Sequence, residues 1–392
     1  MVAATPERPA PAGARAPRTT QRVFYFDLTR GIAAQLVVVG HLLNISYPHI
    51  FMPPKGQGHP FYIQSFAVVV FFVLSGYLIA GTVKRKGQDP RYTFGRYLVD
   101  RAARVLFPMF VALALIIGAD RLVFGGSGAT PFRVVDLSPS AIVQAFLMTF
   151  NHPALATAAQ ATGIKQLAVH AVGTGAPLWT VVIEWWIYVT FGILALVVAR
   201  RRRLGVIGGL VLLFAAMMPL AYLGRNIALP LAWLIGMGYA FAADRLDALP
   251  ARVHGWLVGL GVATFVYGCL TSHNNLDSAA TIVPASVAFC SLYFLVKRIP
   301  ASLDPQGLTT RLVQFVSDYS YSLYLIHFSV ITYLWVWLHD DVPAWALVLG
   351  GFTLSNLLAM AFYALVERNH RRVAKLMSRA LPSRREERHA AG

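Results

Sequence analysis

The sequence predicts an all-α membrane protein, a bundle of about ten transmembrane helices with an additional short helix near residues 141–150. Three observations lead to this fold class. Charged residues make up only 13% of the 392 residues and hydrophobic residues 57%, whereas a soluble domain carries about 25% charged residues. The apolar residues come in runs near the length that crosses a bilayer, and the basic residues concentrate in alternate loops. Together these features exclude a soluble enzyme and a disordered protein.

Ten apolar runs approach the length of about 20 residues that a helix needs to cross the hydrocarbon core. They cover residues 28–45, 63–83, 105–124, 178–199, 204–223, 227–243, 253–271, 279–296, 313–338 and 344–366. The apolar stretch at 141–150 is too short to cross, so we expect an interfacial or re-entrant helix there. It belongs to the longest loop, residues 125–177.

The distribution of Lys and Arg predicts the orientation. Alternate loops place 28 of these residues on one side and 4 on the other, while Arg30 and Arg121 lie within spans. Because cytoplasmic loops carry the excess of basic residues, we expect both termini in the cytoplasm. The net charge of +17 then reflects topology, and no nucleic-acid partner is expected. We expect residues 1–22 and 377–392 to be cytoplasmic tails around one membrane domain, residues 23–376.

Arg30 and His41 are ionisable residues within the first span, where such groups are costly and mark candidate functional sites. Eleven positions separate them, so both side chains project from one helix face, about 16 Å apart along the axis. Asp27 and Asn44 lie near the same face. The alternative for Arg30 is a side chain that extends to the membrane boundary. The alternative for His41 is a histidine that merely packs in the core.

Later spans contain further polar residues. Ser75 and Gly76 follow an apolar string, and close helix packing is the alternative explanation for both. Glu184 lies six residues inside its expected span among tryptophans, so we expect it to face a polar cavity. A third group has i, i+4, i+7 spacing and shares one helix face: Ser320, Tyr324 and His327.

These residues resemble the acyltransferase-3 family of membrane proteins, and the resemblance extends from about residue 26 to residue 372. Its most specific element is an arginine, ten residues and a histidine, which Arg30 and His41 match. Residues 71–76 resemble the family's second-helix string. The remaining similar motifs are Arg101, Arg104 and Pro108; Trp179 with Glu184; residues 320–327; and Glu367 with Arg368. Three positions depart from the family pattern without removing an ionisable group: Thr180, Ile187 and Asn369.

The resemblance implies a multi-pass enzyme of the bacterial cytoplasmic (inner) membrane. Members of this family transfer an acyl group, here expected to be acetyl, from cytoplasmic acyl-CoA to a hydroxyl of a polysaccharide, an O-antigen or a secreted metabolite. The expected partners are therefore acyl-CoA, a glycan or glycosylated small-molecule acceptor, and the lipid bilayer. The expected donor-binding residues are Arg30, Ser75, Arg101 and Arg104, and the expected catalytic residues are His41, Glu184 and His327.

Transfer to a hydroxyl needs a general base, and we expect His41 to supply it. Glu184, Asp27 or His327 would orient the imidazole or the acceptor. Direct transfer is the preferred mechanism, and a covalent acyl intermediate on His41 is the alternative. No metal is expected, because two His/Asp groups are read as solvated loop residues: His273 with Asp277, and His339 with Asp340 and Asp341. Cys269 and Cys290 are expected to pack within the membrane.

Two other classes of function stay open at this point. A transporter would use Arg30, Glu184 and His327 as an intramembrane relay, and a scaffold would tolerate replacement of His41. If the protein is an enzyme, we expect the 125–177 loop to select the acceptor, with the 141–150 helix as a lid over the site. Residues 154–175, rich in Ala, Thr and Gly, are expected to be flexible.

Overall fold

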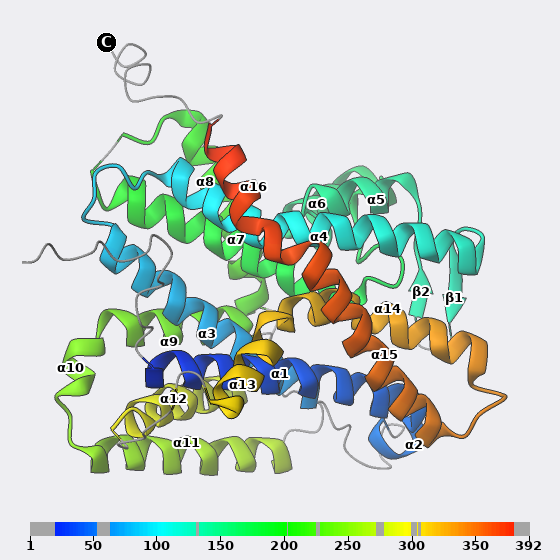
Figure 1. The fold of residues 1–392 in the computed structure, drawn as a ribbon. Helices are drawn as coiled ribbons and strands as arrows, with labels where there is room; N and C mark the ends of the chain where they lie inside the picture. Colours follow the sequence, from blue (N-terminus) through cyan, green and yellow to red (C-terminus); the bar gives the residue numbers. More distant parts are fainter. Residues whose placement is uncertain are drawn as a thin grey trace, which may run out of the picture.

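A computed structural model describes residues 20–52, 63–130, 133–201, 203–224, 228–271, 278–298, 304 and 307–379. Within these ranges the protein is almost entirely helical (Figure 1). Eight helical segments are long and apolar enough to cross a membrane. In chain order, the helices of these segments are α1 (Thr20–Ser46), α3 (Ile63–Lys86), α4 (Phe94–Phe124), α7 (Trp179–Ile193, continued by the π-helical η3, Leu194–Val198), α8 (Val206–Gly224), α12 (Ala279–Val296), α14 (Ser320–Leu338) and α15 (Ala344–Leu365). The predicted class, an all-α polytopic membrane bundle, is confirmed.

Two further helices occupy the remaining expected spans, α9 (Leu229–Phe241) and α11 (Ala251–Thr271). With 13 residues, α9 is about 20 Å long, which is shorter than the hydrocarbon core of about 30 Å. It packs backbone against backbone on α3. A Cβ at Gly76 would lie 2.0 Å from the Trp233 carbonyl oxygen, and a Cβ at Gly236 would lie 2.1 Å from the Val73 carbonyl oxygen. Both glycines are therefore required for this contact.

The expected span at 313–338 was wrong at its start. The chain forms two helices there, α13 (Leu308–Asp318) and α14, with a break at Tyr319. The Tyr319 hydroxyl donates to Asn356 Oδ1 at 2.9 Å, and Ser317 Oγ donates to Asp27 Oδ1 at 3.2 Å. These hydrogen bonds to α15 and α1 hold the break in place. The apolar run at 313–338 is continuous in the sequence and therefore gave no sign of the break.

Helix α4 begins eleven residues before the expected span. Thr93 caps it, because its side-chain oxygen accepts a hydrogen bond from the Arg96 amide at 3.4 Å. Arg101 and Arg104 therefore belong to a regular helix, which continues through Pro108.

The long loop is more ordered than its composition predicted. It contains the antiparallel strands β1 (Gly128–Thr130) and β2 (Arg133–Val135), then α5 (Pro139–Phe146), α6 (Pro153–Thr162), η1 (Lys165–Leu167) and η2 (Ala176–Leu178). The expected short helix is α5, although it ends at Phe146. The expectation of a flexible 154–175 segment was wrong, because α6 is capped by His152, whose ring also stacks on Phe214 with 3.9 Å between centroids.

The loops that are rich in Lys and Arg meet at one end of the bundle, which we call the basic end. Lys84 pairs with Asp244 of α10 (Ala243–Asp247) at 2.8 Å, and Lys297 pairs with Asp247 at 2.5 Å. The hydrogen bond from Lys84 holds the pKa of Asp244 below its ordinary value. The start of α1 and α10 are at the left of Figure 1, whereas α2 (Pro48–Phe51), the β hairpin and the α14–α15 connection are at the right. We call the right side the opposite end.

The chain returns to the basic end after α15. There η4 (Glu367–Asn369) leads into α16 (His370–Arg379), which packs against α4, the helix that carries Arg101 and Arg104 (Figure 1).

Candidate active site

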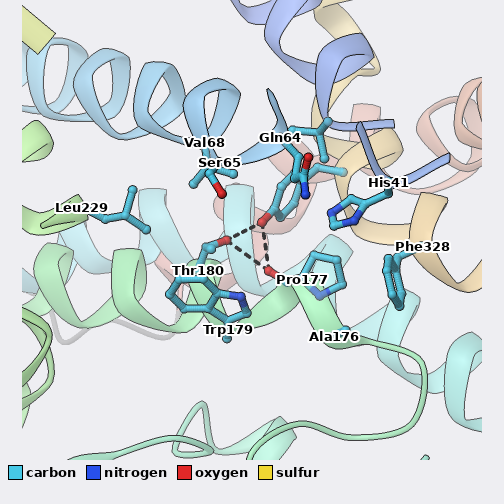
Figure 2. A pocket seen from close by; sticks show the side chains of 12 residues that line it. His41, Gln64, Ser65, Val68, Ala176, Pro177, Trp179, Thr180, Leu229 and Phe328 are labelled. Atoms are coloured by element: carbon cyan, nitrogen blue, oxygen red, sulfur yellow. Dashed lines mark hydrogen bonds between the residues drawn. The ribbon is translucent and has the colours of Figure 1, made fainter. Parts of the chain in front are cut away.

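A pocket of about 290 Å³ lies among α1, α3, α7, α9 and α14. It is near the opposite end of the bundle, because its lining includes the first residues of α3, α7 and α9. Figure 2 shows His41 and Gln64 on one side of this space, with Pro177 and Thr180 across from them. The polar side chains of the lining are His41, Gln64, Ser65, Trp179, Thr180 and Tyr324.

His41 lines the pocket and contacts His327 of α14. The two ring centroids are 5.3 Å apart. His327 is fully buried, and its Nδ1 lies 3.0 Å from the Leu323 carbonyl oxygen and 2.9 Å from that of Tyr324. A carbonyl oxygen only accepts, so Nδ1 carries the hydrogen and Nε2 keeps its lone pair. That Nε2 has no hydrogen-bond partner among the described residues, so it can accept a bond from a neighbouring ring.

Glu184 lies elsewhere, in the middle of the bundle. It accepts a hydrogen bond from the Tyr188 hydroxyl, which lies 2.7 Å from the hydroxyl of Ser75. Trp233 Nε1 donates to the same Ser75 oxygen at 3.1 Å. Ser75 is thus part of a polar chain between α3, α7 and α9, while the adjacent Gly76 makes the close packing contact.

The three arginines singled out in the sequence come together toward the basic end. Arg104 interacts electrostatically with Arg30 of α1, with Arg101 of its own helix and with Glu367 of η4. The Arg104 side chain is exposed. The local excess of positive charge makes this part of the bundle suitable for an anion.

Two carboxylates partly offset the positive charge of the three arginines. Asp27 Oδ1 lies 3.8 Å from Arg30 Nη1. Glu367 is buried and accepts bonds from the Ser322 amide at 3.0 Å and from the Ser322 hydroxyl. Glu367 thereby caps the first turn of α14, the helix that also carries His327.

Glu184 connects these two regions. It has electrostatic interactions with Arg101 and Arg104 on the basic side and with Tyr324, which lines the pocket. It does not line the pocket itself, and no hydrogen bond joins it to His41 within the described residues. The predicted site residues therefore form an extended series along the bundle: the arginines, then Ser75 and Glu184, then His41 and His327.

Sequence analysis missed a buried carboxylate, that of Asp120 in α4. It accepts hydrogen bonds from the Thr174 amide at 2.8 Å, from the Thr174 hydroxyl at 2.9 Å and from the Tyr333 hydroxyl at 2.7 Å. Gly173 has a φ of 50°, and a Cβ there would lie 1.9 Å from Asp120 Oδ2. The signal was present, because an acidic residue inside an apolar run requires a partner.

This group, which we call the Asp120 clasp (Asp120, Gly173, Thr174 and Tyr333), fixes the end of the long loop. Two residues farther along, Ala176 and Pro177 line the pocket. The expected lid was wrong in its residues: no part of 141–150 lines the pocket, and Phe146 of α5 instead contacts Phe110 of α4 with 5.5 Å between ring centroids.

The residues weighed as metal ligands are separated. The described residues contain no group of three or more His, Cys, Asp or Glu side chains that could hold a metal ion. His339 pairs with Asp340 at 3.4 Å, while His273 and Asp277 lie outside the described residues. Cys290 is a buried free cysteine, and the side chain of Cys269 is not among those described.

Comparison with known proteins assigns the class. A model of the acyltransferase-3 family, described as an acyltransferase domain, matches residues 23–364. The chain therefore belongs to this family of membrane acyltransferases, which confirms the resemblance of its motifs and disfavours the transporter interpretation.

A curated relative is the nodulation protein NolL of Sinorhizobium fredii (strain NBRC 101917 / NGR234), which is 29% identical over 154 residues. The match covers 36% of this chain and 39% of NolL, so it spans about two fifths of the relative's length. No solved structure matches the chain.

Proposed function

We propose that the protein transfers an acyl group, acetyl in the simplest case, from acyl-CoA at the basic end to a hydroxyl at the opposite end. The acceptor would be an extracytoplasmic glycan or glycosylated metabolite, and the protein would reside in the cytoplasmic (inner) membrane of a bacterium. The observation that carries this proposal is the separation of the arginine cluster from the His41 pocket along one bundle. Such a separation suits a donor and an acceptor that reach the protein from different sides.

Donor binding follows from charge. The phosphates of CoA would bind Arg101 and Arg104 through charge-assisted hydrogen bonds, with Arg30 beside them. Phosphates cannot enter the hydrocarbon core unaided, so only the pantetheine arm would extend inward. Arg30 and His41 are about 16 Å apart along α1, a distance that an extended arm would cover while it passes Ser75.

In the proposed reaction His41 takes the proton of the acceptor hydroxyl as that oxygen attacks the thioester carbonyl. His327 supports this role, since its unprotonated Nε2 is suited to accept a hydrogen bond from His41 and so orient the ring. Glu184 has no bond to His41. We assign it, with Tyr188, to the polar chain that the thioester would pass on its way to the pocket. Transfer would be direct, without an acyl-His41 intermediate.

Acceptor selection would reside at the opposite end, where the Asp120 clasp sets the position of Ala176 and Pro177. The ordered α6 and η1 of the same loop offer further surface for a glycan.

The test is CoA release by purified protein in lipid nanodiscs, combined with mass analysis of glycans and secreted metabolites from wild-type and deletion cells. We expect thioester cleavage, and a mass shift of one acyl unit that identifies the donor and acceptor. His41→Ala should lower the rate of transfer about 10²- to 10⁴-fold while the protein remains folded. A variant with wild-type turnover would remove His41 from the mechanism.

A further inference from the structure

The pocket contains a polar side chain that the acyl-transfer motifs do not include, Gln64 in the first turn of α3. It is 8% exposed and lines the pocket beside His41 (Figure 2). Its Oε1 is buried without a hydrogen-bond partner in the described structure. Leaving a buried amide oxygen unpaired is unfavourable, so a residue of this type at this place needs an explanation beyond packing.

The backbone of α1 makes room for this amide. A Cβ at Gly40 would lie 2.5 Å from Gln64 Oε1 and 2.8 Å from Ile63 Cγ2, so only glycine permits the carboxamide to lie here. Gly40 directly precedes His41 in the chain. The carboxamide is thus held against the residue next to the proposed base, with its oxygen toward α1 and its NH₂ group left to face the pocket.

The two buried hydroxyl groups of the lining, those of Thr180 and Tyr324, are already engaged, and the remaining hydroxyl, that of Ser65, is only half-buried. The Tyr324 and Thr180 oxygens lie 2.9 Å and 3.1 Å from the Pro177 carbonyl oxygen and 2.5 Å from each other. Each hydroxyl has one hydrogen, so one donates to the carbonyl and the other donates to its neighbouring hydroxyl. These bonds leave neither hydroxyl hydrogen free for a ligand. The amide of Gln64 is therefore the buried polar group of this lining that still has hydrogens to donate.

We infer that Gln64 donates a hydrogen bond to the thioester carbonyl oxygen as that oxygen becomes an oxyanion, which makes it a further catalytic residue. This inference rests on the proposed function. As the acceptor oxygen bonds to the carbonyl carbon, its proton moves to His41 and the C=O electron pair moves to oxygen, where the amide N–H stabilises it. When the pair returns, the C–S bond breaks, and the CoA thiolate leaves and recovers the proton from His41. Each cycle consumes acyl-CoA and a hydroxyl compound and yields an ester and CoA.

One measurement distinguishes a residue that donates a hydrogen bond to the oxyanion from a residue that binds the glycan or metabolite. The same oxyanion forms whether a glycan hydroxyl or water attacks, so loss of a donor to that oxygen slows both reactions. Loss of an acceptor-binding residue slows transfer to the acceptor alone.

The experiment therefore measures CoA release from acetyl-CoA with water as the acyl acceptor, using full-length protein in nanodiscs. Gln64→Met keeps the length of the side chain and removes the N–H groups. We expect it to lower kcat about 10²- to 10³-fold, with KM for acetyl-CoA unchanged and with thermal stability equal to or above wild type, since the unpaired oxygen is also lost. Gln64→Glu, which offers only acceptor atoms, should lose at least as much activity. Gln314→Met, the same substitution at a half-buried glutamine of α13 outside this lining, is the matched control and should stay near wild type.

A Gln64→Met rate within about twofold of wild type would overturn the inference, and so would a loss confined to KM. Absence of CoA release by the wild-type protein itself would instead overturn the proposed function, and with it the inference.

Discussion

The imidazole rings of His41 and His327 lie in contact across α1 and α14, with 5.3 Å between their centroids. One ring faces the pocket, and the other is fully buried with its Nδ1 hydrogen engaged by backbone carbonyls. This arrangement assigns different properties to two residues of the same type: His41 is accessible to a substrate, whereas His327 can act only through its neighbour. The first prediction follows from that difference.

His327→Ala should lower kcat about 10- to 100-fold, the usual cost of losing a group that orients a functional side chain, and should leave KM for acyl-CoA unchanged. His327→Gln retains an acceptor atom of similar reach and should restore part of the rate. Steady-state kinetics of both variants check this prediction. Equal kcat in the alanine and glutamine variants would show that His327 only fills space.

Removal of charge from the arginine cluster should weaken donor binding. The double variant Arg101→Ala/Arg104→Ala should raise the Kd for acyl-CoA at least tenfold, since a hydrogen bond to a charged group contributes about 1.5–3 kcal/mol. Calorimetry with a non-hydrolysable acyl-CoA analogue measures the change.

Arg91→Ala is the control for the arginine cluster, because Arg91 is an exposed residue of the same basic segment that pairs with Asp89 at 3.2 Å. Its Kd should stay within about threefold of wild type, as expected for a surface ion pair. Similar losses in the double variant and in Arg91→Ala would mean that only the overall charge matters.

The Asp120 clasp should govern acceptor binding. Asp120→Asn keeps the shape but replaces one accepting oxygen with an NH₂ group that cannot accept from Thr174 or Tyr333. We expect a several-fold rise in KM for the acceptor, with the Kd for acyl-CoA unchanged, because the displaced residues Ala176 and Pro177 belong to the pocket and not to the arginine cluster. Asp340→Asn, at an exposed carboxylate, serves as control. A change in donor affinity alone would contradict this assignment.

The contact between α3 and α9 should depend on glycine at position 76. Gly76→Ala would drive a methyl group into the Trp233 carbonyl and should reduce stability by about 1–3 kcal/mol. Gly238 lies in α9, the partner helix, where a Cβ would meet nothing within 4 Å. Gly238→Ala should therefore leave stability equal or raise it by up to about 1 kcal/mol. Thermal unfolding of the detergent-solubilised variants separates the two, and equal melting temperatures would refute the backbone contact.

The α6 segment should loosen in acid. Burial lowers the pKa of His152 below its ordinary value, against a smaller opposing effect of its bond to the Phe214 carbonyl. His152 therefore binds a proton more readily when α6 has detached from α8 than when His152 packs on Phe214. The packing of α6 on α8 is strongest above the ordinary histidine pKa and weakens as the pH falls below it. Hydrogen exchange of α6 at pH 7.5 and pH 5 should show this loss, and His152→Phe should abolish the pH dependence. An unchanged exchange rate in the wild-type protein would contradict the prediction.

Most of the fold was predictable, because the length of an apolar run and the side on which basic residues fall are both properties of sequence. The errors share one cause. The break at Tyr319 and the order within residues 154–175 depend on hydrogen bonds or ring contacts between distant segments, and the early start of α4 depends on its polar cap, Thr93. The periodicity of apolar residues encodes neither.

The residues of the candidate site likewise fall into those that the sequence identified and those that only the folded structure revealed. Motifs identified His41, Glu184, His327 and the arginines by residue type and spacing. The clasp at Asp120 and the amide of Gln64 became visible only when loops and helices were placed beside each other. The roles assigned to all of these residues remain predictions for the experiments above.

The glycine contact between α3 and α9 also restricts how molecules can enter. At the depth of Gly76, main-chain atoms of the two helices touch, so no gap the width of a lipid chain or a sugar separates them. A lipid-linked acceptor therefore cannot enter sideways from the bilayer through this seam. It must approach along the bundle axis or through a different helix pair, and a cross-link that fixes α3 to α9 should leave its access intact.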